Sequence, residues 1–312
     1  MKKVLITGVH GFVGSNLVHA LKESYNIYGL DIVSPQNDGV SNTFGWKELE
    51  KIPSVDVIIH LAGKAHDTNN TVREQDYFDI NLGLTKKIFD YYLNSNATKF
   101  IFFSSVKAVA DSVKGDCLSE EVEPNPSTAY GKSKQEAEKY ILGQTLPKDK
   151  QVYILRPCMI HGPGNKGNLN LLYKFIKNGI PYPLGCFHNK RSMLSVENLC
   201  FIIGELLNRD IVPGAYNVAD DEPLSTEEII RIIGTGIGKK NKIWRIPKKL
   251  IQCIAFVGDI LHLPLNSERL KKLTENYVVS NKKLIKALKR KLPVSAKDGL
   301  LVTIQSFEHI NH

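Results

Sequence analysis

The chain has 312 residues, of which 42% are hydrophobic, and its 41 Lys and Arg against 32 Asp and Glu give a formal net charge of +9. Such a chain can bury a large core, and its composition argues against a disordered protein. Five scattered cysteines without a CxxC pair argue against a disulfide framework and a zinc site, so no metal is expected. Because the sequence shows neither a signal peptide nor a membrane-spanning run, it predicts a cytoplasmic protein.

Short β-branched runs alternate with helical patterns over the first half of the chain. The expected strands are apolar on both faces, as buried parallel strands are. They cover residues 2–8, 26–32, 55–63, 99–105 and 152–157. Helical spacing predicts helices between them in FVGSNLVHALKES, NLGLTKKIFDYYL and AYGKSKQEAEKYIL. This alternation is typical of an α/β fold with a doubly wound parallel sheet of the Rossmann type.

The first predicted strand ends in TGVHGFVG, which places Gly8, Gly11 and Gly14 in a GxxGxxG spacing. Glycines suit a tight strand-to-helix turn whose backbone approaches a diphosphate held at the helix N-terminus. Asp31 ends the second strand, 17 residues beyond Gly14, near the offset at which a carboxylate binds the adenosine ribose. Because this carboxylate would repel a 2′-phosphate, the pattern favours NAD, although NADP stays open.

The stretch PSTAYGKSK places Tyr130 four residues before Lys134 on a predicted helix, and Ser105 ends the fourth strand. Residues four apart on a helix lie about 5 to 6 Å from each other, so we expect the ammonium to lower the pKa of the phenol. Open α/β sheets bind ligands at the carboxyl ends of their strands, where the Ser105 hydroxyl would hold a substrate oxygen beside Tyr130. The three residues predict a catalytic acid–base site.

After about residue 156, Gly/Pro-rich connections separate shorter helical stretches, which predicts a smaller, mixed lobe. We therefore expect a dinucleotide-binding domain over residues 1–156 and a mostly substrate-binding lobe over 157–312. The strand-like segment 214–220 is expected to return to the sheet edge. Sixteen Lys and Arg against three acids between residues 239 and 297 would attract anionic partners, although no nucleic-acid-binding motif is present. Segment 246–263 is a basic amphipathic helix candidate for which packing against the lobe is favoured over contact with a membrane surface.

Together these motifs resemble the extended short-chain dehydrogenase/reductase superfamily, and within it the NAD-dependent nucleotide-sugar epimerases and dehydratases of the UDP-glucose 4-epimerase type. The resemblance covers nearly the whole chain and implies bound NAD, a UDP-sugar substrate and a homodimer packed through the helices near Asn81 and Thr128. It assigns Arg191, in KRSMLSVENL, to the substrate diphosphate, and Asn168 is a further candidate substrate contact. The residues that it assigns to the cofactor are Gly8, Gly11, Phe12, Val13, Gly14, Asp31, Leu61, Ala62, Gly63, Asn81, Tyr130 and Lys134.

The resemblance implies that Tyr130 removes the proton of the sugar C4 hydroxyl while hydride passes to the nicotinamide. Val106 and Lys107 stand where dehydratases of this family carry an acidic pair, which disfavours elimination. Val109 and Met159 depart from the usual epimerase pattern, and the surrounding segments look closer to a subgroup that includes 4-ketoreductases.

Three functions are therefore weighed. The first is a 4-epimerase of a UDP-hexose or UDP-N-acetylhexosamine. The second is an NAD(P)H-dependent 4-ketoreductase of a UDP-4-keto-6-deoxy-N-acetylhexosamine in surface polysaccharide synthesis. The third, of another class, is a non-catalytic regulator that senses dinucleotides, and it is disfavoured because such proteins usually lose the Tyr or the Lys.

Overall fold

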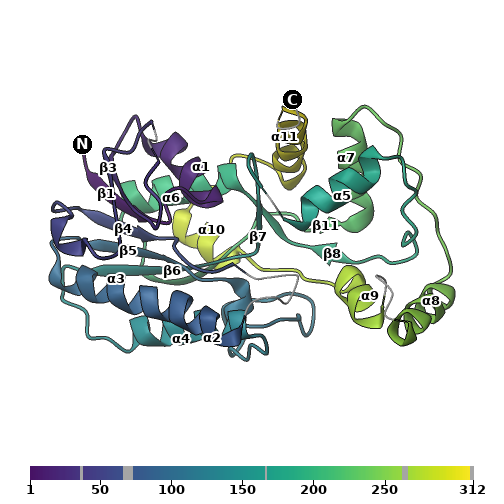
Figure 1. The fold of residues 1–312 in the computed structure, drawn as a ribbon, viewed down its shortest axis with the longest axis horizontal. Helices are drawn as coiled ribbons and strands as arrows, with labels where there is room; N and C mark the ends of the chain where they lie inside the picture. The colour runs from purple at the N-terminus through teal and green to yellow at the C-terminus, as the bar shows by residue number, and fades with distance from the viewer. Residues whose placement is uncertain (36–37, 66–72, 166, 262–265, 310–312) are drawn as a thin grey trace.

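Seven parallel strands form the central sheet of the computed structural model, which describes residues 1–35, 38–65, 73–165, 167–261 and 266–309. The strands are β1 (Lys3–Thr7), β2 (Asn26–Leu30), β3 (Asn42–Phe44), β4 (Val57–His60), β5 (Lys99–Phe103), β6 (Gln151–Pro157) and β10 (Gly214–Val218). Their order is β10-β6-β5-β4-β1-β2-β3, and every neighbouring pair is parallel. The strand order reverses between β1 and β4, so the predicted doubly wound α/β fold is confirmed (Figure 1).

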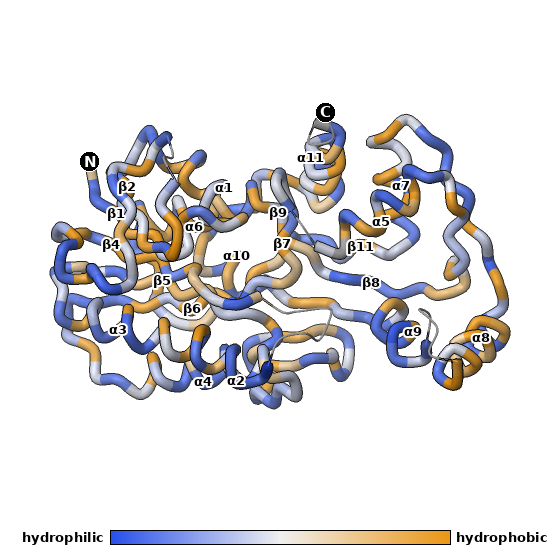
Figure 2. Tube along the Cα trace, in the orientation of Figure 1, coloured by the Kyte–Doolittle hydropathy of each residue, from blue (hydrophilic) through white to orange (hydrophobic). Residues whose placement is uncertain are grey.

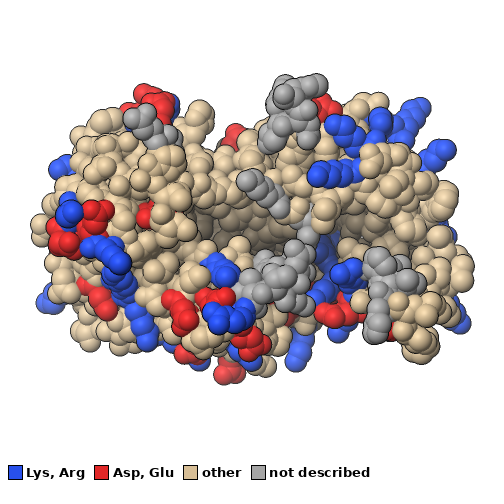
Figure 3. All heavy atoms as spheres, viewed as in Figure 1, with Lys and Arg blue, Asp and Glu red and all other residues tan. Residues whose placement is uncertain are grey.

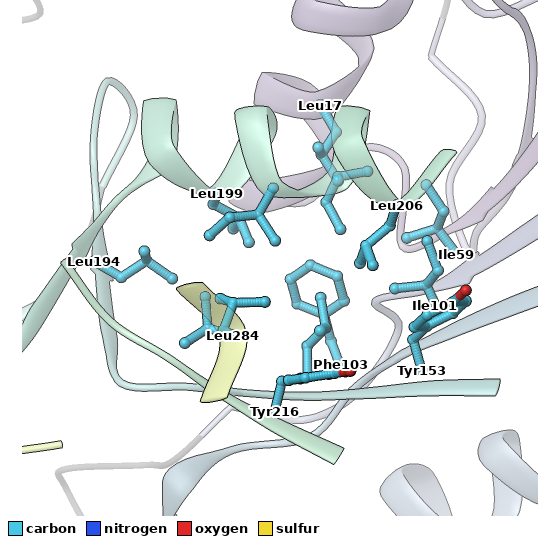
Figure 4. Close-up of a cluster of buried hydrophobic side chains, with 14 of the residues drawn as sticks. Leu17, Ile59, Ile101, Phe103, Tyr153, Leu194, Leu199, Leu206, Tyr216 and Leu284 are labelled. Atoms are coloured by element: carbon cyan, nitrogen blue, oxygen red, sulfur yellow. The ribbon is translucent and has the colours of Figure 1, made fainter. Parts of the chain in front are cut away.

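Helices cover both faces of the sheet, because successive residues of a strand point to opposite sides. On one face, Val4 and Ile6 belong to a core with α1 (Phe12–Leu21), α6 (Val196–Asn208) and α10 (Lys282–Leu288). Figure 4 shows how side chains from α1, α6 and α10 meet those of the strands in this core. On the other face, Leu5 belongs to a core with α3 (Gly83–Asn94) and α4 (Ala129–Leu142).

The five strands expected in the first half of the chain correspond to β1, β2, β4, β5 and β6. Segment 214–220 contains β10, which pairs with β6 at one edge of the sheet. The three-residue strand β3 was not predicted, because Asn42–Phe44 has no apolar run and is extended through its pairing with β2. The predicted helix AYGKSKQEAEKYIL coincides with α4.

Short helical turns lie in the connections between the strands of the sheet. They are η1 (Leu49–Lys51), α2 (Glu74–Tyr77), the π-helical η2 (Phe78–Leu82) and η3 (Val106–Ala108). Of these, η2 leads directly into α3 and η3 directly follows β5.

A smaller lobe lies beside the sheet and has its own apolar core (Figure 1). Its elements are β7 (Met159–His161), α5 (Asn168–Lys177), β8 (Lys190–Arg191), β9 (Met193–Ser195), β11 (Leu224–Ser225), α7 (Thr226–Gly236), α8 (Lys248–Ile260), α9 (Ser267–Thr274) and α11 (Ala296–His309). Two small sheets, β7 with β9 and β11 with β8, join these parts.

The second half of the chain contributes to both lobes, since α6, β10 and α10 belong to the core of the large sheet. The division of the chain at residue 156 stays a prediction about its domains. Among the described residues, no helix is both long enough and apolar enough to cross a membrane.

Candidate active site

The glycine-rich turn between β1 and α1 is tightly packed against neighbouring backbone. Gly8 has a φ of +69°, and a Cβ placed on it would lie 3.0 Å from the backbone nitrogen of Ala62. A Cβ on Gly14 would lie 2.3 Å from the carbonyl oxygen of Gly8. Gly11 is the N-cap of α1, and Phe12 and Val13 form its first turn. The turn therefore exposes helix N-terminal amides with no side chain in front of the cap, as a diphosphate requires.

Asp31 lies immediately after β2, beside the glycine-rich turn. Its Oδ2 accepts a hydrogen bond of 3.0 Å from the backbone N–H of His10, and its Oδ1 accepts one of 2.7 Å from Ile32. These two amides orient the carboxylate while leaving each oxygen a further lone pair. The arrangement fits the two hydroxyls of an adenosine ribose and would repel a 2′-phosphate.

A directed hydrogen-bond chain joins the ends of β1 and β4 to η2. Ala62 donates its N–H to Thr7 Oγ1 at 3.0 Å, Thr7 Oγ1 lies 2.7 Å from His60 Nδ1, and His60 Nε2 lies 3.0 Å from Thr85 Oγ1. Thr85 in turn donates its hydroxyl to the carbonyl oxygen of Asn81 at 2.6 Å. Burial holds the pKa of His60 well below its usual value, so the ring is neutral and links two hydroxyls. Sequence reasoning found neither Thr7 nor Thr85.

Asn81, within the π-helical turn η2, connects the segment after β4 to α4. Its Oδ1 accepts a 2.7 Å hydrogen bond from the N–H of Lys64, and its Nδ2 donates to Ser133 Oγ at 3.0 Å. A Cβ on Gly63 would lie 2.8 Å from Asn81 Oδ1 and 3.3 Å from Lys134 Nζ. Residues Leu61 to Gly63 thus pass close to Lys134, and a side chain at position 63 would narrow the space beside its ammonium.

Ser105, Tyr130 and Lys134 come together at the carboxyl edge of the sheet. The hydroxyls of Ser105 and Tyr130 are hydrogen bonded to each other, and Ser105 Oγ accepts a 3.1 Å bond from the N–H of Lys107. Lys134 donates from Nζ to the carbonyl oxygen of Phe103 at 2.8 Å. The fold explains this meeting, since η3, which follows β5, packs against α4.

The electrostatics of this group differ from the expectation. Lys134 was expected to lower the pKa of Tyr130, but burial raises the pKa of Tyr130, opposed by its hydrogen bond with Ser105. Burial also lowers the pKa of Lys134 to about 8, while the nearby Glu138 carboxylate raises it. Both groups are buried and the ammonium is directed at the carbonyl oxygen of Phe103, so desolvation is the largest effect on each. In the chain alone, Tyr130 keeps its proton at neutral pH.

A buried ion pair connects α4 to β6. Arg156, in β6, donates from Nη2 to Glu138 Oε2 at 2.5 Å and from Nε to Oε1 at 3.0 Å, and Ser104 also donates to this carboxylate. Because Glu138 lies one helical turn after Lys134, its negative charge acts on the ammonium as well as on Arg156. The pair was not predicted, although an arginine inside an apolar strand indicates a buried partner.

Asp111 fixes the segment that leads into α4, whose N-cap Thr128 lies two residues before Tyr130. Its Oδ2 accepts hydrogen bonds from the N–H groups of Ser127 and Thr128 at 2.7 and 3.0 Å, and its Oδ1 accepts the Thr128 hydroxyl at 2.9 Å. Thr128 is the N-cap of the helix and accepts from the N–H of Gly131 at 3.2 Å. These bonds set the position from which the Tyr130 side chain leaves the backbone.

The smaller lobe brings positive charge to the opposite side of the cleft, which Figure 3 shows as a hollow between the lobes. The Arg191 guanidinium donates to the carbonyl oxygen of Lys272, while its Nε is buried with no hydrogen-bond partner among the described residues. Tyr277 donates its hydroxyl to Ala110 O at 2.7 Å, and Lys107 Nζ lies 4.4 Å from its ring centre. Burial lowers the pKa of Lys107, while the charges of Asp111 and Glu275 raise it and those of Arg191 and Lys272 lower it. Arg191 of the smaller lobe and Lys107 of η3 are thus two neighbouring cations, which suits a diphosphate.

Two points of the sequence analysis remain, the candidate substrate contact Asn168 and the question of a metal site. Asn168 begins α5, and its side chain lies outside the part of the chain that the structure describes. Within the described residues, no group of three or more His, Cys, Asp or Glu side chains could hold a metal ion.

Comparison with known families and proteins gives a consistent result. The model of the NAD dependent epimerase/dehydratase family matches residues 4–219, more than half of the chain. The chain is 29% identical over 327 residues to a UDP-glucose 4-epimerase of Vibrio cholerae, covering 100% of this chain and 97% of that protein. It is 28% identical over 267 residues to the N-acetyl-alpha-D-glucosaminyl-diphospho-ditrans,octacis-undecaprenol 4-epimerase of Escherichia coli O157:H7, covering 83% of this chain and 79% of that protein.

Solved structures share the fold over almost the whole chain. A UDP-glucose 4-epimerase from Thermotoga maritima, solved with UDP-glucose, superposes with a TM-score of 0.77 at 18% identity and covers 99% of this chain and 100% of its own. The enzyme WbmG of Bordetella bronchiseptica, in complex with NAD and UDP, gives a TM-score of 0.75 at 17% identity, covering 98% of this chain and 94% of its own. At these identities the similarity shows the fold.

Proposed function

Because the chain belongs to the NAD dependent epimerase/dehydratase family, we propose that it is an NAD-dependent 4-epimerase of a UDP-hexose or UDP-N-acetylhexosamine. The observation that carries the proposal is the hydrogen-bonded pair of hydroxyls, Ser105 and Tyr130, beside Lys134 at the carboxyl edge of the sheet. The acid–base phenol lies near two cations, Lys107 of η3 and Arg191 of the smaller lobe, which matches a sugar carried on a diphosphate.

The residues of the sheet lobe fit the cofactor of the family. The turn with Gly8, Gly11 and Gly14 suits the diphosphate, and Asp31 suits the adenosine ribose. Gly63 leaves room beside Lys134, where a Cβ would come within 3.3 Å of the ammonium. When bound there, NAD supplies a positively charged ring that accepts hydride from the sugar and returns it.

The reaction that follows from this arrangement needs one proton acceptor and one orienting hydroxyl. Tyr130 takes the proton of the C4 hydroxyl as the C4–H bond breaks, and Ser105 holds the same oxygen by a hydrogen bond. Once the 4-keto sugar had turned over in the cleft, Tyr130 would return the proton to its C4 oxygen, while NAD held by the glycine-rich turn and Asp31 would supply the hydride. Since Tyr130 is protonated in the chain alone, a cation brought into the cleft is needed to favour its phenolate form.

The two positions that carry an acidic pair in dehydratases of the family hold no carboxylate in this chain. Val106 is buried, and Lys107 is held between the carbonyl oxygen of Asp111, at 2.7 Å from Nζ, and the ring of Tyr277. Neither side chain can act as the carboxylate base that the resemblance implies for dehydratases. The site therefore supports epimerisation or ketone reduction over dehydration.

Substrate assays separate the two remaining reactions. Purified protein is incubated with NAD and UDP-glucose, or UDP-N-acetylglucosamine, while the sugar product and the absorbance of the reduced nicotinamide are followed. Epimer formation without net cofactor reduction supports the proposal. If neither sugar turns over but NADH is oxidised when a UDP-4-keto-6-deoxy sugar is supplied, the 4-ketoreductase replaces it.

A second substrate class belongs in the same assay. The Escherichia coli relative is named for a 4-epimerisation of N-acetylglucosamine carried on an undecaprenyl diphosphate. Such a substrate shares the N-acetylated sugar, and it shares the diphosphate that Arg191 and Lys107 would bind. It differs in carrying an undecaprenyl chain in place of the uridine. Turnover of the lipid-linked sugar without turnover of any UDP-sugar would move the proposal to this class.

Two further expectations are part of the proposal. The homodimer through the helices near Asn81 and Thr128 is tested by sedimentation velocity, with a monomer at micromolar concentration as the contrary result. The cytoplasmic location is tested by fractionation of cells that express the protein.

A further inference from the structure

An unusually apolar surface lies on α8, at the end of the smaller lobe farthest from β3 (Figure 1). Only Ile251, Ala255 and Gly258 of this helix are buried, so a narrow stripe packs it against the lobe. Leu250, Ile254, Val257 and Leu261 follow one another at helical spacing, and all are exposed. Figure 2 shows the helix as mostly hydrophobic. The lobe packing expected from the sequence thus accounts for less than half of the helix surface.

The concentration of apolar side chains here is out of proportion to the rest of the molecule. Eight of the nineteen exposed large hydrophobic residues among the described ones fall between residues 244 and 273. They are Trp244, Leu250, Ile254, Phe256, Val257, Ile260, Leu261 and Leu273. We call the six of them that lie on α8 and its C-cap, from Leu250 to Leu261, the α8 patch. Contiguous apolar patches on a folded protein mark an interaction surface, whereas single exposed apolar residues do not.

Positive charge lies next to the α8 patch. Exposed basic residues lie in the segment before α8, in its first turn and on α9, which contacts it; they are Lys242, Arg245, Lys248, Lys249, Arg269, Lys271 and Lys272. The acids nearby are engaged, since Asp259 accepts the N–H and hydroxyl of Ser267 and Glu268 pairs with Lys272 at 2.7 Å. An apolar arc with basic flanks is the pattern of helices that lie in the interface of an anionic membrane.

We propose that the α8 patch docks the protein peripherally on an anionic lipid bilayer. The apolar residues of α8 enter the boundary between headgroups and acyl chains, and the neighbouring Lys and Arg contact the anionic headgroups. No spanning helix is required. Because α8 lies at the outer end of the smaller lobe, docking through this helix leaves the hollow between the lobes open (Figures 1 and 3).

Charge also argues against a second copy of the chain as the occupant. A two-fold interface would place the α8 patch against itself and bring the same cluster of basic residues face to face. Like charges at an interface are repulsive, whereas an anionic bilayer satisfies both the apolar and the cationic parts of the surface.

The test is co-sedimentation of the full-length protein with vesicles of phosphatidylglycerol and phosphatidylcholine, or of phosphatidylcholine alone. We expect binding to the anionic vesicles that weakens at high salt, and at least tenfold weaker binding to the neutral ones. Val257→Glu should lower binding to the anionic vesicles at least tenfold. Its matched control is Val212→Glu, a more exposed valine (72% against 46%) outside the patch, which should change binding less than twofold.

A second pair of variants tests the role of charge. Lys249→Glu, beside the patch, should weaken binding to anionic vesicles severalfold, whereas Lys148→Glu, an exposed lysine on the sheet lobe, should not. Absence of binding by the wild type, or equal binding of Val257→Glu, would overturn the proposal. So would a lipid-free oligomer that Val257→Glu dissociates, because the patch would then be a protein contact. All these readouts are independent of the reaction in the cleft.

Discussion

Replacing Tyr130 with Phe removes one oxygen atom from the site and leaves the ring in place. The ring keeps its edge-to-face contact with Tyr77, whose centroid lies 6.0 Å away at an interplanar angle of 70°. The fold loses the hydrogen bond between this hydroxyl and Ser105, which contributes about 1 kcal/mol. A folded domain has about 5 to 15 kcal/mol of stability, so the variant should remain folded.

The effect on catalysis should be much larger. An acid–base group contributes roughly 10²- to 10⁴-fold to the rate, which corresponds to about 3 to 5 kcal/mol of transition-state stabilisation. We therefore expect the rate of C4 epimerisation by Tyr130→Phe to fall by that factor while NAD binding changes less than twofold. The loss of rate exceeds the loss of stability because the oxygen is a reactant in every turnover and only one of many contacts in the fold.

The assay compares initial rates at saturating NAD, NAD binding by calorimetry and unfolding in urea. Tyr140→Phe is the matched control, since it removes the same atom from the same helix. There the hydroxyl bonds Asp90 at 2.5 Å on the surface. Rates of Tyr130→Phe close to the wild type, or an equal loss in Tyr140→Phe, would refute the assignment of the acid–base group.

Three more predictions follow from the site. Gly14→Ala should abolish NAD binding, because the new Cβ would lie 2.3 Å from Gly8 O. Its control Gly204→Ala adds a Cβ with no atom within 4 Å and should raise the free energy of unfolding by about 0.5 to 1 kcal/mol. Calorimetry measures NAD binding and thermal unfolding measures stability for both variants. Lys134→Met should abolish turnover yet raise the stability of the cofactor-free protein by about 1 to 3 kcal/mol at pH 7, measured in urea. The folded wild type releases the lysine proton near pH 8 and the unfolded chain near 10.5, so wild-type stability rises over that window and the difference should shrink by pH 10. Arg191→Ala should raise KM for the UDP-sugar about tenfold or more with little change in kcat, and Arg191→Lys should restore it only in part.

Local patterns were enough to predict most of the sheet lobe. Buried parallel strands are continuous apolar runs, and α4 is bounded by a capping Thr128 and by Gly143, so both kinds of element are visible in short windows of sequence. The strand β3 lacks such a signal because pairing with β2, and not the composition of Asn42–Phe44, makes it extended. The pKa of Tyr130 was mispredicted for a related reason: spacing shows that Lys134 is near, but burial depends on residues far away in the chain.

The sequence predicts the polar contacts that support the site only in part. Thr7, His60 and Arg156 each stand at or near the end of an apolar strand, and a buried polar group needs a partner, so partners could be expected. Their identities could not, because Thr85 is 25 residues from His60 and Glu138 is 18 from Arg156. Only the strand order determines which polar side chains meet. The same order brings Ser105 to Tyr130, because the neighbouring strands β5 and β6 both lead to residues that contact α4, so the catalytic and supporting residues are positioned by one physical cause.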